Sequence, residues 1–269
     1  MRRLGLQRIG LRLVALGYLA VILVGPLSIV FWRTFEDGFA PAWDALTTSE
    51  TIHAFKLTLI ITAIAVPVNT VFGIVAALAI VRKRFPGKGV LNAFIDLPLA
   101  LSPVVVGLSL FLLYGREGWF GGWLSEHGID VLFALPAMVI ATIFVSIPFV
   151  AREVVPTLQE IGDEQEQAAR TLGANGWQTF WRITLPSIRW AVIYGVILTT
   201  ARCLGEYGAV AVVSGRVQGE TETATLRVQE RYESFDLAGA YAISIVLALV
   251  AILVLVAMTV IRPREDTAH

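Results

Sequence analysis

Five long stretches of the sequence contain no charged residue, and they constrain the fold more than any other feature. A helix needs about 20 consecutive apolar residues to cross the hydrocarbon core of a bilayer. The stretches are 20, 25, 19, 21 and 25 residues long and run over 13–32, 57–81, 97–115, 131–151 and 237–261. A sixth apolar stretch contains Arg189, Arg202 and Glu206. We therefore expect six spans, at about 13–32, 57–81, 90–115, 131–151, 187–213 and 237–261.

Composition supports a membrane protein and argues against a soluble domain. The 269 residues are 56% hydrophobic and 16% charged, with a mean hydropathy of +0.72. Soluble domains are about 45–50% apolar with glycine included and about 25% charged. The 21 basic and 21 acidic residues cancel, so net charge gives no reason to expect a nucleic-acid partner. The sequence thus predicts an all-α polytopic chain, with residues 1–269 forming one transmembrane domain in a lipid bilayer.

Lysine and arginine are unequally distributed between alternate loops, which predicts the orientation of the chain, because basic residues are retained on the cytoplasmic side. Fourteen of the 21 basic residues lie at the N-terminus and in 82–88, 152–189 and 262–264. Six lie in the intervening segments, and Arg202 lies within a span. Both termini are therefore expected in the cytoplasm.

The longest expected cytoplasmic segment, which precedes the fifth span, has the pattern of two short helices. Asp163 followed by Glu166 predicts an N-cap with a capping-box partner, and Gly173 predicts the C-terminal stop of the first helix. The second helix is expected to begin at about Asn175 and to end at Pro186. Such a pair could lie in the lipid interface through its tryptophans or form a docking surface for a cytoplasmic partner. The residues alone leave both interpretations open.

The spacing within this segment resembles the E-A-A-x(3)-G-x(9)-I-x-L-P loop of ABC importer permeases. The residues that carry the resemblance are Gln167, Ala168, Ala169, Gly173, Ile183, Leu185 and Pro186. Gln167 stands where the family usually has glutamate, which removes one charge but leaves the spacing intact. The resemblance implies that the loop of about 156–186 is a coupling helix, which fits into a groove on an ATP-binding subunit and transmits its closure.

The chain itself has no G-x(4)-G-K-[ST] P-loop, since the nearest string, Gly87–Lys88–Gly89, lacks the hydroxyl residue. The resemblance implies that ATP and Mg²⁺ are bound by a partner ATPase, and we expect no cofactor on this chain. His53, His127 and His269 are scattered without metal-ligand spacing, and no nucleophile–base set is visible. We therefore expect neither a metal site nor catalysis.

The fifth span narrows the resemblance to the sulfate/molybdate permeases. These share an R-x-L-G-E-[FY]-G core, which lies here at 202–208, and the extension Gly219–Glu220–Thr221 favours the sulfate type. The similar stretches cover roughly 55–235. The resemblance implies a type I ABC importer permease fold in the bacterial inner membrane and ATP-driven import of sulfate and thiosulfate. A molybdate or tungstate permease and, from another class, an ATP-independent secondary anion transporter remain alternatives, although the coupling loop argues against the latter.

The resemblance also implies partners. These are a second, homologous permease, a dimer of ABC ATPases and an extracytoplasmic sulfate-binding protein. The polar segment 214–236 has a charge run that is typical of a solvated face, and the resemblance places it on the surface where the binding protein docks.

Arg202 and Glu206 are the charged residues expected inside the fifth span. Four positions apart on one helix, they share a face and can pair, and an unpaired charge at mid-bilayer would cost at least about 2.5–3.5 kcal/mol. One interpretation is a neutralised structural pair. In the other, Gly205 and Gly208 loosen the helix, so that Arg202 presents its planar donor fork to a tetrahedral oxyanion on the translocation pathway. Asp96 in the third span is expected to be a paired structural acid.

Overall fold

The computed structural model describes residues 2–36 and 38–261, and the described residues contain helices but no strand. Arg262 and Arg264, which contributed to the expected orientation, lie outside them. In chain order the elements are α1 (Arg2–Leu19), η1 (Ala20–Val24), α2 (Gly25–Phe35), α3 (Phe39–Thr47), α4 (Ser49–Arg82), α5 (Lys88–Ala100), α6 (Pro103–Tyr114), α7 (Gly121–Glu126), α8 (Leu135–Ser146), α9 (Pro148–Ile161), α10 (Glu164–Thr171), α11 (Gly176–Thr179), η2 (Phe180–Thr184), α12 (Leu185–Leu204), α13 (Gly208–Val213), α14 (Ala224–Glu233) and α15 (Leu237–Ile261), where η denotes a π-helical turn.

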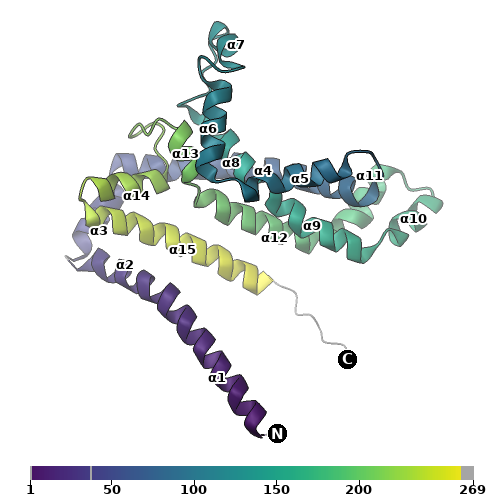
Figure 1. The fold of residues 1–269 in the computed structure, drawn as a ribbon, viewed down its shortest axis with the longest axis horizontal. Coiled ribbons are helices and arrows are strands. Elements are labelled where there is room, and N and C mark those ends of the chain that lie inside the picture. Colours follow the sequence, from purple (N-terminus) through teal and green to yellow (C-terminus); the bar gives the residue numbers. More distant parts are fainter. Residues whose placement is uncertain (1, 37, 262–269) are drawn as a thin grey trace.

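Long helices that run along the main axis of the molecule dominate the architecture (Figure 1). Five helical stretches are long and apolar enough to cross a membrane: Gly10–Phe35, Ser49–Arg82, Leu135–Ile161, Gly176–Leu204 and Leu237–Thr259. The pair α5 and α6 qualifies as a sixth if the two bent helices are counted as one span. The all-α fold expected from the sequence is confirmed.

The third expected span, 90–115, is not one continuous helix, because the chain bends by 111° between α5 and α6. The backbone is extended at Leu101 and Ser102, with ψ of 140° and 136°. A residue before proline avoids the helical conformation because it clashes with the proline ring, and Pro103 then starts the next helix, where its missing N–H is not needed. As a result, α6 and α7 project away from the long helices (Figure 1).

Two glycines allow α4, α9 and α12 to pack closely around Val150. A Cβ atom on Gly73 would lie 2.6 Å from Val150 Cβ, and one on Gly195 would lie 2.8 Å from Val150 Cα. Small residues at helix crossings let backbones approach, which is a main source of packing energy inside a membrane. A buried Asn69 joins α4 to α8, because its Nδ2 donates to Ser146 Oγ at 2.7 Å. These contacts make α4, α8, α9 and α12 the central body of the fold.

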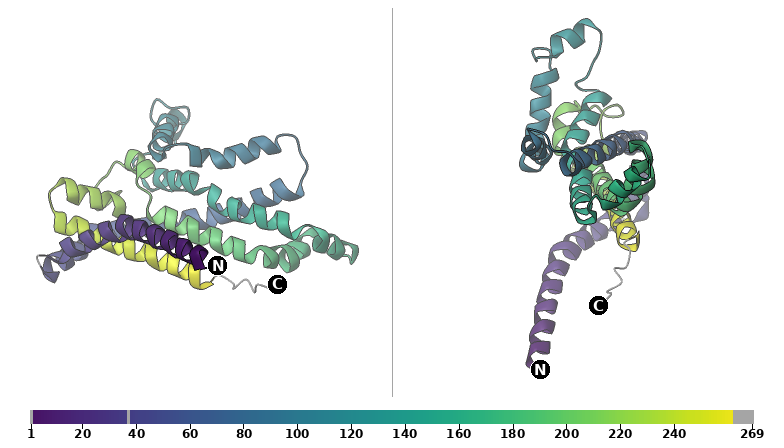
Figure 2. Two further views of the ribbon diagram at one scale, coloured as in Figure 1. Left: turned by 60° about the horizontal axis from the view of Figure 1, so that its bottom comes forward. Right: turned by 90° about the vertical axis from the view of Figure 1, so that its right-hand side faces the viewer.

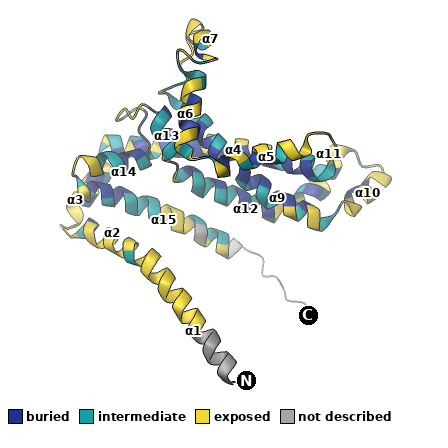
Figure 3. Ribbon diagram, in the orientation of Figure 1, coloured by how far each residue is buried: buried dark blue, intermediate teal, exposed yellow. Residues whose placement is uncertain are grey.

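The first candidate span diverges from this body toward its N-terminus, as Figure 1 and the right-hand view of Figure 2 show, and Figure 3 colours most of its described residues as exposed. Its apolar side chains are uncovered: Val14, Val21 and Trp32 are each 73% exposed. Apolar surface of this extent requires lipid or another protein to cover it.

Pro186 does not end the second short helix, contrary to expectation. The helix runs through η2 into α12, and the Leu185 N–H bonds to Phe180 O, five residues back. This wider turn shifts the hydrogen-bond register just before a residue that cannot donate. The same device precedes Pro26, where the Gly25 N–H bonds to Ala20 O. The loop before the fifth span is therefore joined to that span by continuous helix.

Candidate functional site

The first half of the coupling-loop pattern lies on α10, at the end of the molecule farthest from α14 (Figure 1). Gln167 and Ala168 are exposed, whereas Ala169 is buried. Gly173 has a φ of +89° and ends the helix as expected. Its N–H bonds to Arg170 O, and the next N–H, of Ala174, bonds back to Ala169 O, both at 3.0 Å. These two bonds form a Schellman motif, which needs a left-handed residue at this position.

The second half of the pattern lies elsewhere. Ile183 is in η2, and Leu185 and Pro186 begin α12, at the root of the fifth candidate span. Among the described residues, one side-chain hydrogen bond joins the two halves, in which Thr184 Oγ1 donates to Glu166 Oε1 at 3.0 Å. The structure thus separates an exposed helix from the segment that attaches it to the membrane part.

The expected capping box at Asp163 and Glu166 is wrong. Asp163 is the N-cap residue of α10 but makes no side-chain cap hydrogen bond, and Glu166 points inward, where its Oε2 accepts from Arg82 Nε at 3.1 Å. A capping box occurs one helix later instead. Asn175 Oδ1 accepts from the Gln178 N–H at 2.9 Å, and Gln178 Oε1 accepts from the Asn175 N–H at 3.0 Å.

Four residues form an exposed patch on this end of the molecule, which we call the α10–α11 surface: Ala168, Leu172, Trp177 and Trp181. Leu172 is 88% exposed and Trp177 is 71% exposed. Trp177 and Trp181 contact each other edge to face, with ring centroids 5.5 Å apart. Large side chains held in place but uncovered are suited to docking, either on a protein or at a membrane interface.

The Arg202–Glu206 pair lies where the fifth expected span is interrupted. The expected range 187–213 is not one helix, because α12 ends at Leu204 and α13 begins at Gly208. Arg202 Nη1 lies 2.6 Å from Glu206 Oε2, so the two side chains do pair. The Glu206 side chain is 3% exposed, and its other oxygen, Oε1, accepts from the Ala209 N–H at 2.9 Å. Glu206 therefore also caps α13.

Arg202 is much less engaged than Glu206. Its side chain is 28% exposed, and within the described residues no second partner of its guanidinium is found. Beside Glu206 lies a cavity of about 10 Å³, lined by Thr58, Thr142, Cys203, Glu206 and Thr223 and by aliphatic groups, which is near the size that one water molecule needs. The break in the span therefore combines a partly free arginine with a polar pocket.

Asp96 has the partner expected of a structural acid. Arg152 Nε, on α9, donates to Asp96 Oδ1 on α5 at 2.6 Å. The pairing holds α5 against the central body next to the sharp bend.

The polar segment 214–236 is not simply a solvated face, because part of its charge is buried. Arg227 is 3% exposed and Glu222 is 2% exposed. Arg227 Nη1 lies 3.2 Å from both Glu222 Oε2 and Glu230 Oε2, and Arg227 Nη2 lies 4.0 Å from Glu50 on α4. Burial raises the pKa of the Glu222 carboxyl, and Arg227 offsets part of that rise. The i,i+3 spacing of Arg227 and Glu230 was the available signal for this network.

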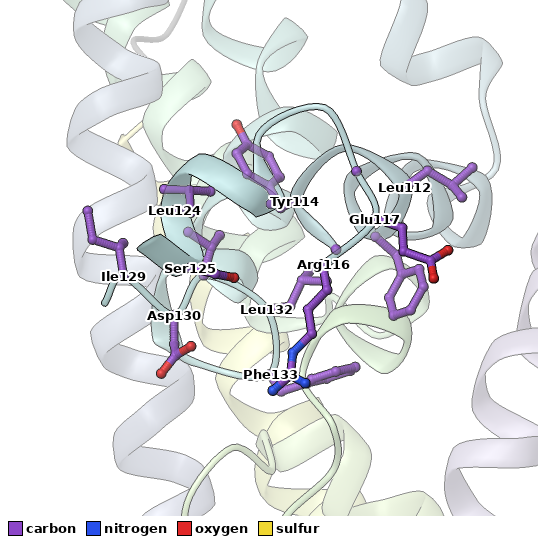
Figure 4. Close-up of a pocket in the computed structure, with 15 residues that line it drawn as sticks. Leu112, Tyr114, Arg116, Glu117, Leu124, Ser125, Ile129, Asp130, Leu132 and Phe133 are labelled. Atoms are coloured by element: carbon purple, nitrogen blue, oxygen red, sulfur yellow. The ribbon is translucent and has the colours of Figure 1, made fainter. Parts of the chain in front are cut away.

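A cavity of about 650 Å³ lies between α6, α7 and the segment that leads to α8. Figure 4 shows Arg116 extending toward Phe133 across it. No residue of the coupling-loop pattern lines this cavity, nor do Arg202 and Glu206. Among the described residues, no group of three or more His, Cys, Asp or Glu side chains could hold a metal ion.

Comparison with known proteins places these sites in a family. The family described as "Binding-protein-dependent transport system inner membrane component" matches residues 69–267. The sulfate transport system permease protein CysW of Synechocystis sp. is 48% identical over 255 residues, which cover 95% of this chain and 92% of the relative. CysW of Escherichia coli (strain K12) is 44% identical, covering 94% and 88%. CysT of the same strain is 37% identical, covering 92% and 89%.

Solved structures agree on the fold. A chain of a bacterial ABC transporter involved in the import of the acidic polysaccharide alginate matches with a TM-score of 0.81 and 17% identity, covering 98% of this chain and 97% of that chain. The resemblance to ABC importer permeases of the sulfate type is confirmed. The chain is a multi-pass membrane protein that belongs to the family of binding-protein-dependent transport system inner membrane components.

Proposed function

We propose that this chain is the transmembrane permease subunit of an ATP-driven importer of sulfate, which also accepts thiosulfate. The observation that carries the proposal is its 44–49% identity, over nearly its whole length, to proteins named sulfate transport system permease protein CysW. The match to the alginate importer supports the permease fold but says nothing about the anion.

The assembly that we propose contains a second permease, two ATPase subunits and an extracytoplasmic sulfate-binding protein. Similarity to both CysW and CysT of one organism supports a pair of related permeases. The α10–α11 surface supports docking of an ATPase, because Leu172 and Trp177 are uncovered in this chain. ATP and Mg²⁺ would be bound by that partner, and this chain would not be catalytic. A related alginate transporter has been solved with a periplasmic protein bound.

In the proposed orientation, in a bacterial inner membrane, α10 and both termini face the cytoplasm and the segment 214–236 faces outward. The basic residues support this orientation. Cysteines introduced at Leu172, which is 88% exposed, and at Val217, which is 45% exposed, test it in a Cys203→Ser background. In the permease expressed without the ATPase, which would cover Leu172, the Leu172→Cys variant should react with a membrane-impermeant reagent only from inside, and Val217→Cys only from outside. Labelling of both from the outside would contradict the topology.

Arg202 is the residue that we propose to meet the anion. One Nη faces Glu206, which leaves the rest of a planar donor fork that suits a tetrahedral oxyanion. Glu206 partly neutralises the charge of Arg202. This suits a transport pathway, because a site that bound the anion tightly would hinder its release. Closure of the ATPases would open the passage outward to the loaded binding protein, and hydrolysis would reset it inward.

The test of the whole proposal is reconstitution. The complex, purified with its partner subunits, should accumulate radiolabelled sulfate in proteoliposomes only when ATP and the binding protein are present. Excess thiosulfate should block uptake, whereas excess molybdate should not. Uptake blocked by molybdate alone would favour a molybdate permease, and uptake without ATP would favour a secondary transporter.

A further inference from the structure

The helix α10 is attached to the rest of the chain by few contacts. Of its eight residues, all within the described part of the chain, Glu166 and Ala169 are buried. Glycines with left-handed backbone flank it on both sides, Gly162 with a φ of +70° and Gly173 with a φ of +89°. Glycine turns give little stiffness by themselves. A movement of α10 therefore reaches the long helices mainly through the side chains that hold α10 in place.

One arginine contributes to that anchorage through three hydrogen bonds. Arg82 is the last residue of α4, and each of its three nitrogens donates to a different group. Nε donates to Glu166 Oε2 at 3.1 Å, Nη1 to Leu158 O at 3.0 Å and Nη2 to Gly162 O at 2.6 Å. Leu158 is in the last turn of α9, where carbonyls have no partner within the helix. Arg82 thus joins α4, the end of α9, the turn before α10 and α10 itself.

Glu166 extends the connection to a third long helix. Its second oxygen accepts from Thr184 Oγ1 at 3.0 Å, and Thr184 immediately precedes α12. Glu166 is 7% exposed and Thr184 is 5% exposed. Charge-assisted hydrogen bonds in such a buried setting are short, directional and stronger than those in water. Arg82, Glu166 and Thr184 therefore form one network, which we call the Arg82 clamp.

We infer that Arg82 is a positioning residue for transport: the clamp makes α10 move as one body with α4, α9 and α12. The inference rests on the proposed function, in which α10 receives movement from the ATPase. From Thr184 to the break after Leu204, α12 spans about 30 Å at 1.5 Å per residue. A stiff connection at its root is what carries a displacement of α10 to the Arg202–Glu206 pair at its other end.

The test compares variants that keep charge or shape but lose the connection. Arg82→Lys retains the charge, but its single nitrogen cannot reach all three acceptors that Arg82 contacts through three separate nitrogens. Glu166→Gln retains the shape but lacks the charge, and Thr184→Val removes a single hydrogen bond without changing volume. Arg33→Lys is the matched control, because Arg33 pairs with Glu36 at 2.8 Å on an exposed surface. All four are purified as complete transporters.

In the Arg82→Lys and Glu166→Gln complexes, sulfate uptake per ATP hydrolysed should fall at least tenfold, while complex yield and ATP hydrolysis stay within about twofold of the unmodified complex. Thr184→Val should lose about two- to fivefold, and Arg33→Lys should behave as the unmodified protein. Normal uptake per ATP in assembled Arg82→Lys and Glu166→Gln complexes would overturn the inference. If those two variants do not assemble, normal coupling in Thr184→Val would overturn it.

Amide hydrogen exchange gives a readout that does not depend on the anion. Arg82→Lys should speed exchange in residues 164–172 at least tenfold, with no change in α8. Unchanged exchange in that segment would also overturn the inference. If the unmodified complex transports no sulfate, the assigned substrate is wrong, and exchange alone then decides the role of Arg82.

Discussion

Two arginine–glutamate pairs, one near each end of α12, differ in how completely the arginine is used. All three nitrogens of Arg82 donate, to Glu166, Leu158 and Gly162. Arg202 faces Glu206, with Nη1 2.6 Å from Oε2, and no residue other than Glu206 pairs with its guanidinium within residues 2–36 and 38–261. The carboxylates are equally buried, with Glu166 7% exposed and Glu206 4% exposed.

The difference separates a structural arginine from one that can bind a ligand. A guanidinium has five N–H donors in a fixed plane. At Arg82 the protein engages all three nitrogens and three of the five N–H donors, which leaves few donors for an incoming anion. Where the protein occupies only one, as at Arg202, the other donors remain available. The side-chain exposures, 15% for Arg82 and 28% for Arg202, follow the same order.

We expect the largest effect, a loss of folding stability, from substitutions in the Arg82–Glu166 pair. Arg82→Met leaves Glu166 buried without its cation, and loss of one partner of a buried pair costs about 3–5 kcal/mol. Adding Glu166→Leu should restore only part of this, because the carbonyls of Leu158 and Gly162 still lack a donor, at about 1–3 kcal/mol. Thermal unfolding of the purified complex in detergent measures both. Full recovery in the double variant would show that the carbonyl contacts contribute little.

The Arg82–Glu166 pair is also a contact that could not be predicted from the sequence. The presence of long apolar helices was predictable because each uncharged run is local. Glu166 was misassigned to a local capping box because its partner, Arg82, lies 84 residues earlier in the chain, a separation that no local pattern records. Asp96 was correctly expected to be paired, but Arg152 could not be named as its partner for the same reason.

Other differences between the expected and the observed structure arose at positions where the local sequence did carry a signal. Residues 90–115 were expected to form one span, yet the restriction on Ser102, the residue before Pro103, accompanies a bend of 111°. Pro186 was read as a stop, yet the π-turn η2 carries the helix past it. The polar run 214–236 was read as solvated because each charge was considered alone, whereas Arg227 and Glu222 are buried together.

We expect the second largest effect, on stability and on sulfate uptake, from substitutions in the Arg202–Glu206 pair. Arg202→Met leaves Glu206 with only the Ala209 N–H, which should cost about 1–3 kcal/mol. Arg202→Met/Glu206→Leu should assemble, with a residual loss of about 1 kcal/mol for the missing cap of α13. If Arg202 meets the anion, this double variant should lose at least tenfold in sulfate uptake at normal complex yield.

Arg202→Lys also tests whether Arg202 contacts the anion, because the point charge of lysine cannot reproduce the planar donor fork of the guanidinium. It should retain stability through its charge but transport poorly. Near-normal uptake by the assembled double variant would remove the anion-contact role, and the two pairs would then differ only in geometry.

A smaller effect should follow from disturbing α10 without touching either pair. Gly173 has a left-handed backbone, which costs an L-residue about 1–2 kcal/mol, so Gly173→Val should weaken recovery of the ATPase with the permease. Gly173→Asn is the control, because asparagine tolerates this conformation. Gln167→Glu, which restores the usual family residue, should also be tolerated. Equal ATPase recovery with valine and asparagine would argue against docking at this end.

The smallest effect concerns the third buried arginine cluster, at the opposite end of the molecule. Burial raises the pKa of Glu222 above its ordinary value of 4.5, and Arg227 opposes the rise. The folded state therefore holds this proton more tightly than the unfolded chain does, so the contribution of Glu222 to stability is complete below pH 4.5 and is lost as the pH rises through the raised pKa.

Glu222→Gln removes this titration, so its unfolding midpoint should fall less between pH 4 and pH 8 than that of the unmodified protein. The difference should be small because Arg227 stabilises the ionised form. Glu220→Gln, at an exposed neighbour, is the control and should leave the pH dependence unchanged. If Glu222→Gln and the unmodified protein show the same pH slope, Glu222 is as fully paired as Glu166. Arg227 would then be a second arginine held by buried carboxylates, in contrast to the partly exposed Arg202.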